Sequence, residues 1–157
     1  MIGRFVDMAG KHLSVMIHFV WSTKGREAFL SSDWRHRMYG YIGGVLRNKK
    51  AVLICVGGTS DHIHLCVSLP STVTIAEMVN FMKSNSSRWI HRKYPQLEAF
   101  AWQEGYGAFS VSKSAEQKLI KYIENQESHH SRRDFKEEFL NLPKKHDLEY
   151  NEKYIWD

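Results

Sequence analysis

The sequence predicts an α+β fold in which helices cover one face of a central antiparallel sheet. Two observations lead to this prediction. Short apolar runs alternate with helical patterns along the chain, and the two runs nearest its middle are joined by a glycine-rich turn of the kind that closes a hairpin. In addition, 43% of the 157 residues are hydrophobic and 13% are aromatic, which suffices for the core of one globular domain.

The first strand is predicted over residues 13–22, where the sequence LSVMIHFVWS is mostly apolar. A basic, turn-like segment follows it. Ser32 or Asp33 can then cap a helix that runs toward Asn48, because both short side chains accept hydrogen bonds from the amides of a first helical turn.

The central hairpin is predicted from two apolar runs, AVLICV at 51–56 and HIHLCVSL at 62–69, on either side of the turn signal GGTSD. Side chains alternate between the two faces of a strand, so His62 and His64 share one face of the second run. The residues that point to the opposite face are all apolar: Ile63, Leu65, Val67 and Leu69.

Two further helices are predicted from capping boxes. The box TIAE at 74–77 opens a helix that continues to about His91 and is ended by a Tyr-Pro pair. The segment 100–112 begins as a loop and ends as a short strand, after which the box SAEQ at 114–117 opens a third helix. Apolar residues within 135–140 suggest one more helix.

The resulting order is strand, helix, strand, strand, helix, strand, followed by C-terminal helices. This is the order of a ferredoxin-like sandwich, whose two main helices cover one face of the sheet. The other face of the sheet is then expected to be free for function. We expect a single domain over 13–157, preceded by an irregular extension at 1–12.

Composition narrows the class of protein. Twenty-two Lys and Arg against 17 Asp and Glu give a net charge of +5, as expected of a surface that binds a polyanion. Cys55 and Cys66 have neither CxxC spacing nor the numbers of a disulfide framework, which favours the reducing cytoplasm. No signal peptide is recognisable, and no stretch approaches the roughly 18 to 20 apolar residues of a membrane span.

The paired histidines point to metal binding. His62 and His64 stand at i and i+2 on one strand, so both imidazoles can reach one divalent cation. The same spacing also occurs where one histidine is hydrogen-bonded in the interior and the other lies at the surface. Cys66 shares their face and could complete a zinc-like set, although a buried strand cysteine is usually inert.

Tyr122 and Gln126 stand one helical turn apart, so a phenol hydroxyl and an amide oxygen can face the same cleft. An amphipathic helix also uses tyrosine as a core residue whose hydroxyl reaches solvent. The residues alone leave both interpretations of Tyr122 open.

Read in order, the segments DHIHLCVSLP, FMKSNSSRWIH, FAWQEGYGAFSVS, LIKYIENQESHH and EYNEKYIWD resemble a known family. They are similar to the HUH-type single-tyrosine transposases of bacterial insertion sequences, the 200/605 group, over about residues 13–157. The resemblance implies a ferredoxin-like fold and an enzyme that cleaves and rejoins single-stranded DNA at the hairpin-bearing ends of an insertion sequence.

The resemblance also implies the site residues. His62 and His64 correspond to the family's metal ligands and Tyr122 to its nucleophile, while Gln126 matches a third ligand position at which members vary. It further implies a homodimer in which each active site combines one subunit's histidines with the other's tyrosine helix.

These residue types suit the implied chemistry. Two imidazoles and an amide oxygen leave positions open at Mg²⁺ or Mn²⁺ for phosphate oxygens. Attack by Tyr122 would give a 5′-phosphotyrosine and a free 3′-hydroxyl, which requires no nucleotide cofactor. Consistently, the chain has no GxxxxGK[ST] phosphate loop.

DNA binding would need basic and aromatic side chains that contact phosphates and stack on unpaired bases. Each candidate can equally be a solvated charge or a core aromatic. His129 and His130 could contact metal or phosphate but match the ligand position less well than Gln126. The candidate DNA contacts are Lys83, Arg88, Arg92, Trp102, Tyr106 and Phe109.

Two alternatives remain at the level of sequence. A metal-dependent nuclease that activates water would gather carboxylates, but near the histidines only Asp61 is available, and strand parity turns it to the opposite face. A domesticated or non-catalytic relative would keep the fold and bind single-stranded nucleic acid without cutting it.

Overall fold

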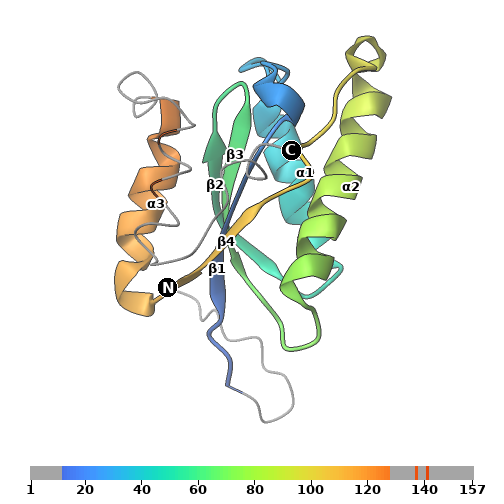
Figure 1. Ribbon diagram of the computed structural model, residues 1–157. Coiled ribbons are helices and arrows are strands. Elements are labelled where there is room, and N and C mark those ends of the chain that lie inside the picture. The colour runs from blue at the N-terminus through green and yellow to red at the C-terminus, as the bar shows by residue number, and fades with distance from the viewer. Residues whose placement is uncertain (1–11, 128–136, 138–140, 142–157) are drawn as a thin grey trace.

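A four-stranded antiparallel sheet forms the centre of the protein in a computed structural model that describes residues 12–127, Glu137 and Asn141. The strand order, β2-β3-β1-β4, and the alternation with helices are those of the predicted ferredoxin-like sandwich (Figure 1). In chain order the strands are β1 (Met16–Ser22), β2 (Val52–Gly58), β3 (His62–Ser68) and β4 (Gly107–Val111).

Helices cover both faces of this sheet. α1 (Arg35–Arg47) and α2 (Ile75–Lys93) pack side by side on one face, and α3 (Glu116–Glu124) lies on the other (Figure 1). The second face, which we expected to be free, is therefore covered where α3 contacts β2 and β3. None of the described helices has the length and apolar character needed to cross a membrane.

The parity predicted for β3 is confirmed. Ile63, Leu65 and Val67 are fully buried in the core between the sheet and the pair of helices α1 and α2. His62 and His64 point to the face that α3 covers and are fully buried there. Burial of each large aliphatic side chain is worth about 1.5–3 kcal/mol, so register in this strand is strongly specified.

The capping box at the start of α2 is also confirmed. The Thr74 hydroxyl accepts a hydrogen bond from the backbone N–H of Glu77, and the Glu77 carboxylate accepts one from the N–H of Thr74. The helix continues two residues beyond the predicted end at His91 and stops before Tyr94-Pro95, where proline disfavours helical backbone in the residue before it.

Two predicted helix caps are wrong. A turn starting at Ser31 precedes α1, so neither Ser32 nor Asp33 occupies the cap and α1 begins at Arg35. A short 3-10 turn at Lys113–Ala115 likewise precedes α3 and moves the cap to Ala115, whereas the Ser114 hydroxyl pairs with that of Ser112.

Several predicted features lie outside the described residues. These are the histidines His129 and His130, the helix at 135–140 except for Glu137, which is helical, and the N-terminal extension except for its last residue, His12.

Candidate active site

Strand β3 delivers two imidazoles to the space between the sheet and α3. The ring centroids of His62 and His64 lie 5.2 Å apart, and the two rings are nearly perpendicular. Neither side chain is exposed to solvent. Burial between a sheet and a helix fixes both rings, as a preformed site requires.

His62 is held from both ends of its ring. Its Nδ1 lies 2.8 Å from Oδ1 of Asp61 and 3.0 Å from the hydroxyl of Thr59, and its Nε2 lies 3.1 Å from Oε1 of Gln126. Strand alternation predicts that Asp61 points away from the face of His62. Asp61 belongs to the turn before β3, however, where this alternation does not apply. Its carboxylate therefore contacts the ring that follows it.

The Gln126 amide links α3 to the histidines. Its Nε2 donates a hydrogen bond to the carbonyl oxygen of Tyr122, 3.1 Å away. This bond turns Oε1 toward His62, and the side chain is 1% exposed. The half-buried Tyr122 ring packs edge-on against His64, with 5.6 Å between centroids. One chain thus brings together all four residues predicted for the site.

Helix α3 reaches the histidines because β2 carries a glycine beneath it. A Cβ atom added at Gly57 would lie 2.3 Å from the carbonyl oxygen of Ile123, far inside contact distance. Only a residue without a side chain allows this approach. Beyond the end of α3, Glu127 forms an ion pair with the buried Arg35 of α1.

His18 of β1 also belongs to the cluster, although its position in the sequence does not indicate this. Its Nε2 lies 2.9 Å from Nδ1 of His64, and the two ring planes lie at 24° to each other with centroids 5.2 Å apart. The centroid of Tyr122 is 6.4 Å from that of His18. A lone histidine in an apolar strand was the available signal, but only the pairing of β1 with β3 shows what it faces.

The donors that could hold a metal here are two imidazoles and one amide oxygen. No three His, Cys, Asp or Glu side chains in the described part of the chain are grouped to hold a metal ion. The zinc-like set with Cys66 is therefore not formed; Cys66 packs with Cys55, Met16 and Ile123. Asp61 and Gln126 show how His62, His64 and Gln126 could bind a cation. The Asp61 carboxylate favours a proton on Nδ1 of His62, which leaves the unprotonated Nε2 facing the amide oxygen of Gln126.

Lys83 is the most constrained of the predicted DNA contacts. Its amine donates hydrogen bonds to the carbonyl oxygens of Gln103, Glu104 and Gly105, which fixes the loop before β4. It also lies over the ring of Tyr106, 5.8 Å from the centroid. Burial lowers the pKa of the Lys83 amine to about 8, against the opposing effect of Glu104.

Among the other predicted DNA contacts, Tyr106 lies beside Lys83, whereas Phe109 and Trp102 are buried. Phe109 is buried on the active-site face, 6.1 Å from His18 between ring centroids. Trp102 is buried under α2, where its Nε1–H donates to Ser86. Arg92 and Tyr106 are exposed. Their roles on DNA stay predictions.

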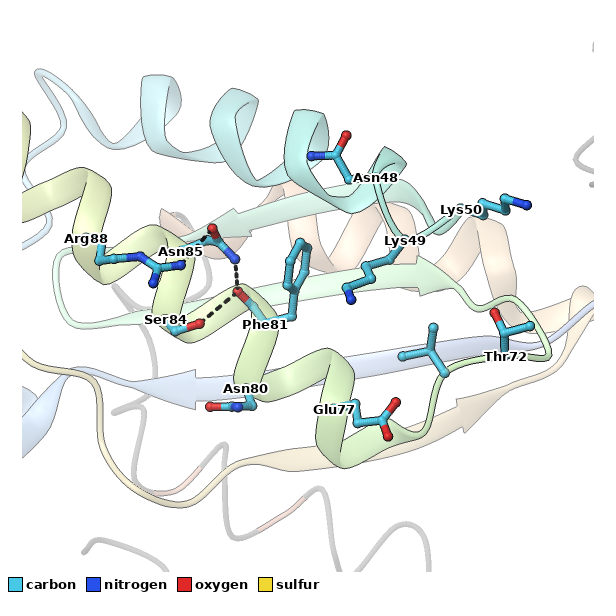
Figure 2. A pocket seen from close by; sticks show the side chains of 11 residues that line it. Asn48, Lys49, Lys50, Thr72, Glu77, Asn80, Phe81, Ser84, Asn85 and Arg88 are labelled. Atoms are coloured by element: carbon cyan, nitrogen blue, oxygen red, sulfur yellow. Dashed lines mark hydrogen bonds between the residues drawn. The ribbon is translucent and has the colours of Figure 1, made fainter.

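Arg88 lines a pocket on the helical layer (Figure 2). This cavity of about 590 Å³ lies between the end of α1 and one side of α2. Lys49 lies over the ring of Phe81, and Asn85 bonds both the Phe81 carbonyl oxygen and the Arg88 guanidinium (Figure 2). The pocket shares no lining residue with the histidine cluster.

Comparison with known families decides the wider identity of the chain. The family described as "Transposase IS200 like" matches residues 11–126, which include the whole histidine and tyrosine cluster. The chain belongs to the IS200-like transposase family. Two curated relatives of this transposase are the transposases for insertion sequence element IS200 of Salmonella typhimurium and Salmonella typhi. Each is 23% identical over 124 residues, covering 71% of this chain and 81% of the relative.

Solved structures show the same fold for the transposase. A putative transposase from Deinococcus radiodurans superposes with a TM-score of 0.63 at 22% identity, covering 76% of this chain and 95% of the other. A REP-associated tyrosine transposase bound to a REP hairpin superposes with a TM-score of 0.59 at 13% identity, covering 79% and 73%.

Proposed function

We propose that this transposase cleaves and rejoins single-stranded DNA at the ends of an insertion sequence, with Tyr122 as the nucleophile. The observation that carries the proposal is the packing of Tyr122 against His64 in the same cluster as His62 and Gln126. The one phenol of this cluster stands beside its metal-type donors, as transesterification on a phosphate requires.

The proposed step conserves bonds. The Tyr122 oxygen attacks the scissile phosphorus, a tyrosyl O–P bond forms, and the bond from phosphorus to the 3′ oxygen breaks. The phenol proton is lost and the leaving oxygen gains one, so the products are a 5′-phosphotyrosine and a 3′-hydroxyl. Attack by a 3′-hydroxyl on this linkage reverses the exchange and rejoins DNA without a nucleotide cofactor.

His62, His64 and Gln126 would hold Mg²⁺ or Mn²⁺. When bound, the cation would neutralise charge that develops on the phosphate oxygens and orient the scissile bond. The surrounding residues support this assignment, because Asp61 and Thr59 hold the far nitrogen of His62 and the Tyr122 carbonyl oxygen holds the amide of Gln126. Such outer contacts orient ligands and tune their affinity.

The DNA partner we propose is a single strand that carries a hairpin near the cleavage site, in the cytoplasm of a bacterium. One solved relative is bound to a REP hairpin. In this chain, the exposed Tyr106 beside Lys83 is the aromatic side chain that we assign to unpaired bases. The net charge of +5 suits the phosphate backbone.

We also propose a homodimer whose active sites are shared. If α3 exchanged between two subunits, its contacts with β2 and β3 would be the same and only the chain that supplies Tyr122 would change. The turn at Lys113–Ala115 joins α3 to β4 and would set the direction in which the helix leaves.

Incubation with oligonucleotides from the element ends and Mg²⁺ tests the proposed function. We expect a denaturation-resistant protein–DNA adduct with single strands and none with duplex. Cleavage that leaves a free 5′-phosphate and no adduct would indicate a nuclease that uses water. Tight binding without cleavage would indicate a non-catalytic relative.

A further inference from the structure

Each of the two histidines proposed as metal ligands has a partner at its Nδ1 atom, and the two partners differ. For His62 the partners are the Asp61 carboxylate and the Thr59 hydroxyl. For His64 it is a third imidazole, that of His18, 2.9 Å away. His18 comes from β1, 46 residues earlier in the chain, and its side chain is 3% exposed.

The chemistry of imidazole ties this contact to the metal site. A neutral histidine carries one proton, and the nitrogen that binds a metal must be the unprotonated one. If His64 is to bind through Nε2, its proton must lie on Nδ1, which faces Nε2 of His18. His18 must then accept a hydrogen bond from that N–H at its unprotonated Nε2 and carry its own proton on Nδ1.

We propose that His18 is a positioning residue for the metal site: it accepts a hydrogen bond from Nδ1 of His64 and so holds the Nε2 atom of His64 ready to bind the cation. The inference rests on the proposed function, because it assumes that His64 is a ligand. His18 fixes both the tautomer and the orientation of the His64 ring, since the two ring planes lie at 24° to each other with centroids 5.2 Å apart, as an in-plane N–H···N bond requires.

The surroundings of His18 favour this role over that of a further ligand. Its Nε2 is already engaged by His64, and its ring centroid lies 6.1 Å from that of Phe109 and 6.4 Å from that of Tyr122. A buried imidazole in this position adds no charge to the site, whereas the carboxylate beside His62 does. The two ligands thus receive one neutral and one acidic partner.

Two amide substitutions of different length test the contact. Glutamine at position 18 can place an oxygen near the position of Nε2, whereas asparagine ends well short of it. We expect His18→Gln to retain most of the Mn²⁺ affinity and His18→Asn to lose about 10- to 100-fold, the usual effect of removing a partner of a metal ligand. Calorimetric titration of the DNA-free protein with Mn²⁺ measures both. His91→Asn removes another hydrogen-bonded histidine and should bind Mn²⁺ like the wild type.

Long-range ¹H–¹⁵N correlation spectra of the imidazoles provide a second readout that needs no metal. In the wild type we expect His64 to carry its proton on Nδ1, and in folded His18→Asn to shift toward the Nε2-protonated form. A wild-type His64 protonated on Nε2, or equal Mn²⁺ affinity in the Gln and Asn variants, would overturn the role of His18.

A further variant separates this inference from the proposed function. If His62→Ala abolishes Mn²⁺ binding while folded His18→Asn binds as the wild type does, His18 has no positioning role but the metal site stands. If the wild type itself binds no Mn²⁺, the proposed metal site fails, and the tautomer of His64 still decides whether His18 orients it.

Discussion

At the scale of single residues, Gln126 connects the two parts of the site. Gln126 lies just beyond α3; its Nε2 donates to the Tyr122 carbonyl oxygen of that helix and its Oε1 faces His62, so the Tyr122 backbone sets the direction of the amide. Gln126 occupies the position of the proposed third metal ligand. Its amide oxygen is a neutral donor, so it adds no negative charge to the site. Its contribution can be isolated because the exposed Gln117 of α3 provides a control.

Gln126→Met, which keeps the volume and removes the oxygen, should weaken Mn²⁺ binding at least about tenfold, since a hydrogen bond or contact to a charged group is worth about 1.5–3 kcal/mol. Gln126→Glu should bind Mn²⁺ as tightly or more tightly. Titration calorimetry measures both, and Gln117→Met should leave affinity unchanged. Wild-type affinity in Gln126→Met would remove Gln126 from the ligand set.

Lys83 should make stability depend on pH in a defined direction. Its pKa is about 8 when folded and 10.5 in the reference state, so between these values the unfolded chain binds more protons than the folded one. The contribution of Lys83 to the free energy of unfolding therefore rises with pH across this window. Urea denaturation of wild type and Lys83→Met at several pH values should show a difference that grows in favour of the wild type. A difference that shrinks with rising pH would contradict the assignment.

At the scale of secondary structure, the decisive element is α3. Its helical face carries Leu119, Tyr122 and Ile123 onto the sheet, and the glycine in β2 lets its backbone come close. The ion pair between Glu127 and Arg35 fastens the segment that follows. The position of the nucleophile therefore depends on a packing contact as well as on the tyrosine itself.

Gly57→Ala should displace α3 from the histidines, because the added Cβ would meet the carbonyl oxygen of Ile123. We expect the free energy of unfolding to fall by about 1–3 kcal/mol, as for overpacking, and adduct formation to fall with it. Gly44→Ala is the matched control in α1, where an added Cβ meets nothing within 4 Å. It should stabilise the helix by roughly 0.5–1 kcal/mol. Full activity in Gly57→Ala would show that α3 need not dock this closely.

At the scale of the whole molecule, the sequence predicts best what depends on local periodicity. Strand alternation alone placed His62 and His64 on one face, and a capping box located the start of α2. His18 could not be predicted in this way, because its contact depends on the register between β1 and β3, which are separated in the chain by α1 and β2. α3 likewise covers the second face of the sheet through tertiary packing. A capping signal predicts where a helix begins but not which face of the sheet it covers.

The shared-site dimer predicts complementation between inactive chains. In a hybrid of His62→Ala and Tyr122→Phe subunits, one of the two sites would combine intact histidines with an intact tyrosine, so mixing should restore adduct formation. Subunit exchange is verified with differently tagged chains. An absence of rescue in verified hybrids would show that each chain builds its site with its own α3.

The central claim is that Tyr122 becomes covalently attached to the 5′ end of the cleaved strand. Trypsin cuts after Lys121 and Arg132, so mass spectrometry of a nuclease-trimmed adduct can locate the attachment within residues 122–132. We predict a nucleotide phosphate on Tyr122 and no adduct from Tyr122→Phe. Attachment at any other residue, or cleavage by the Tyr122→Phe protein with no covalent product, would contradict the account.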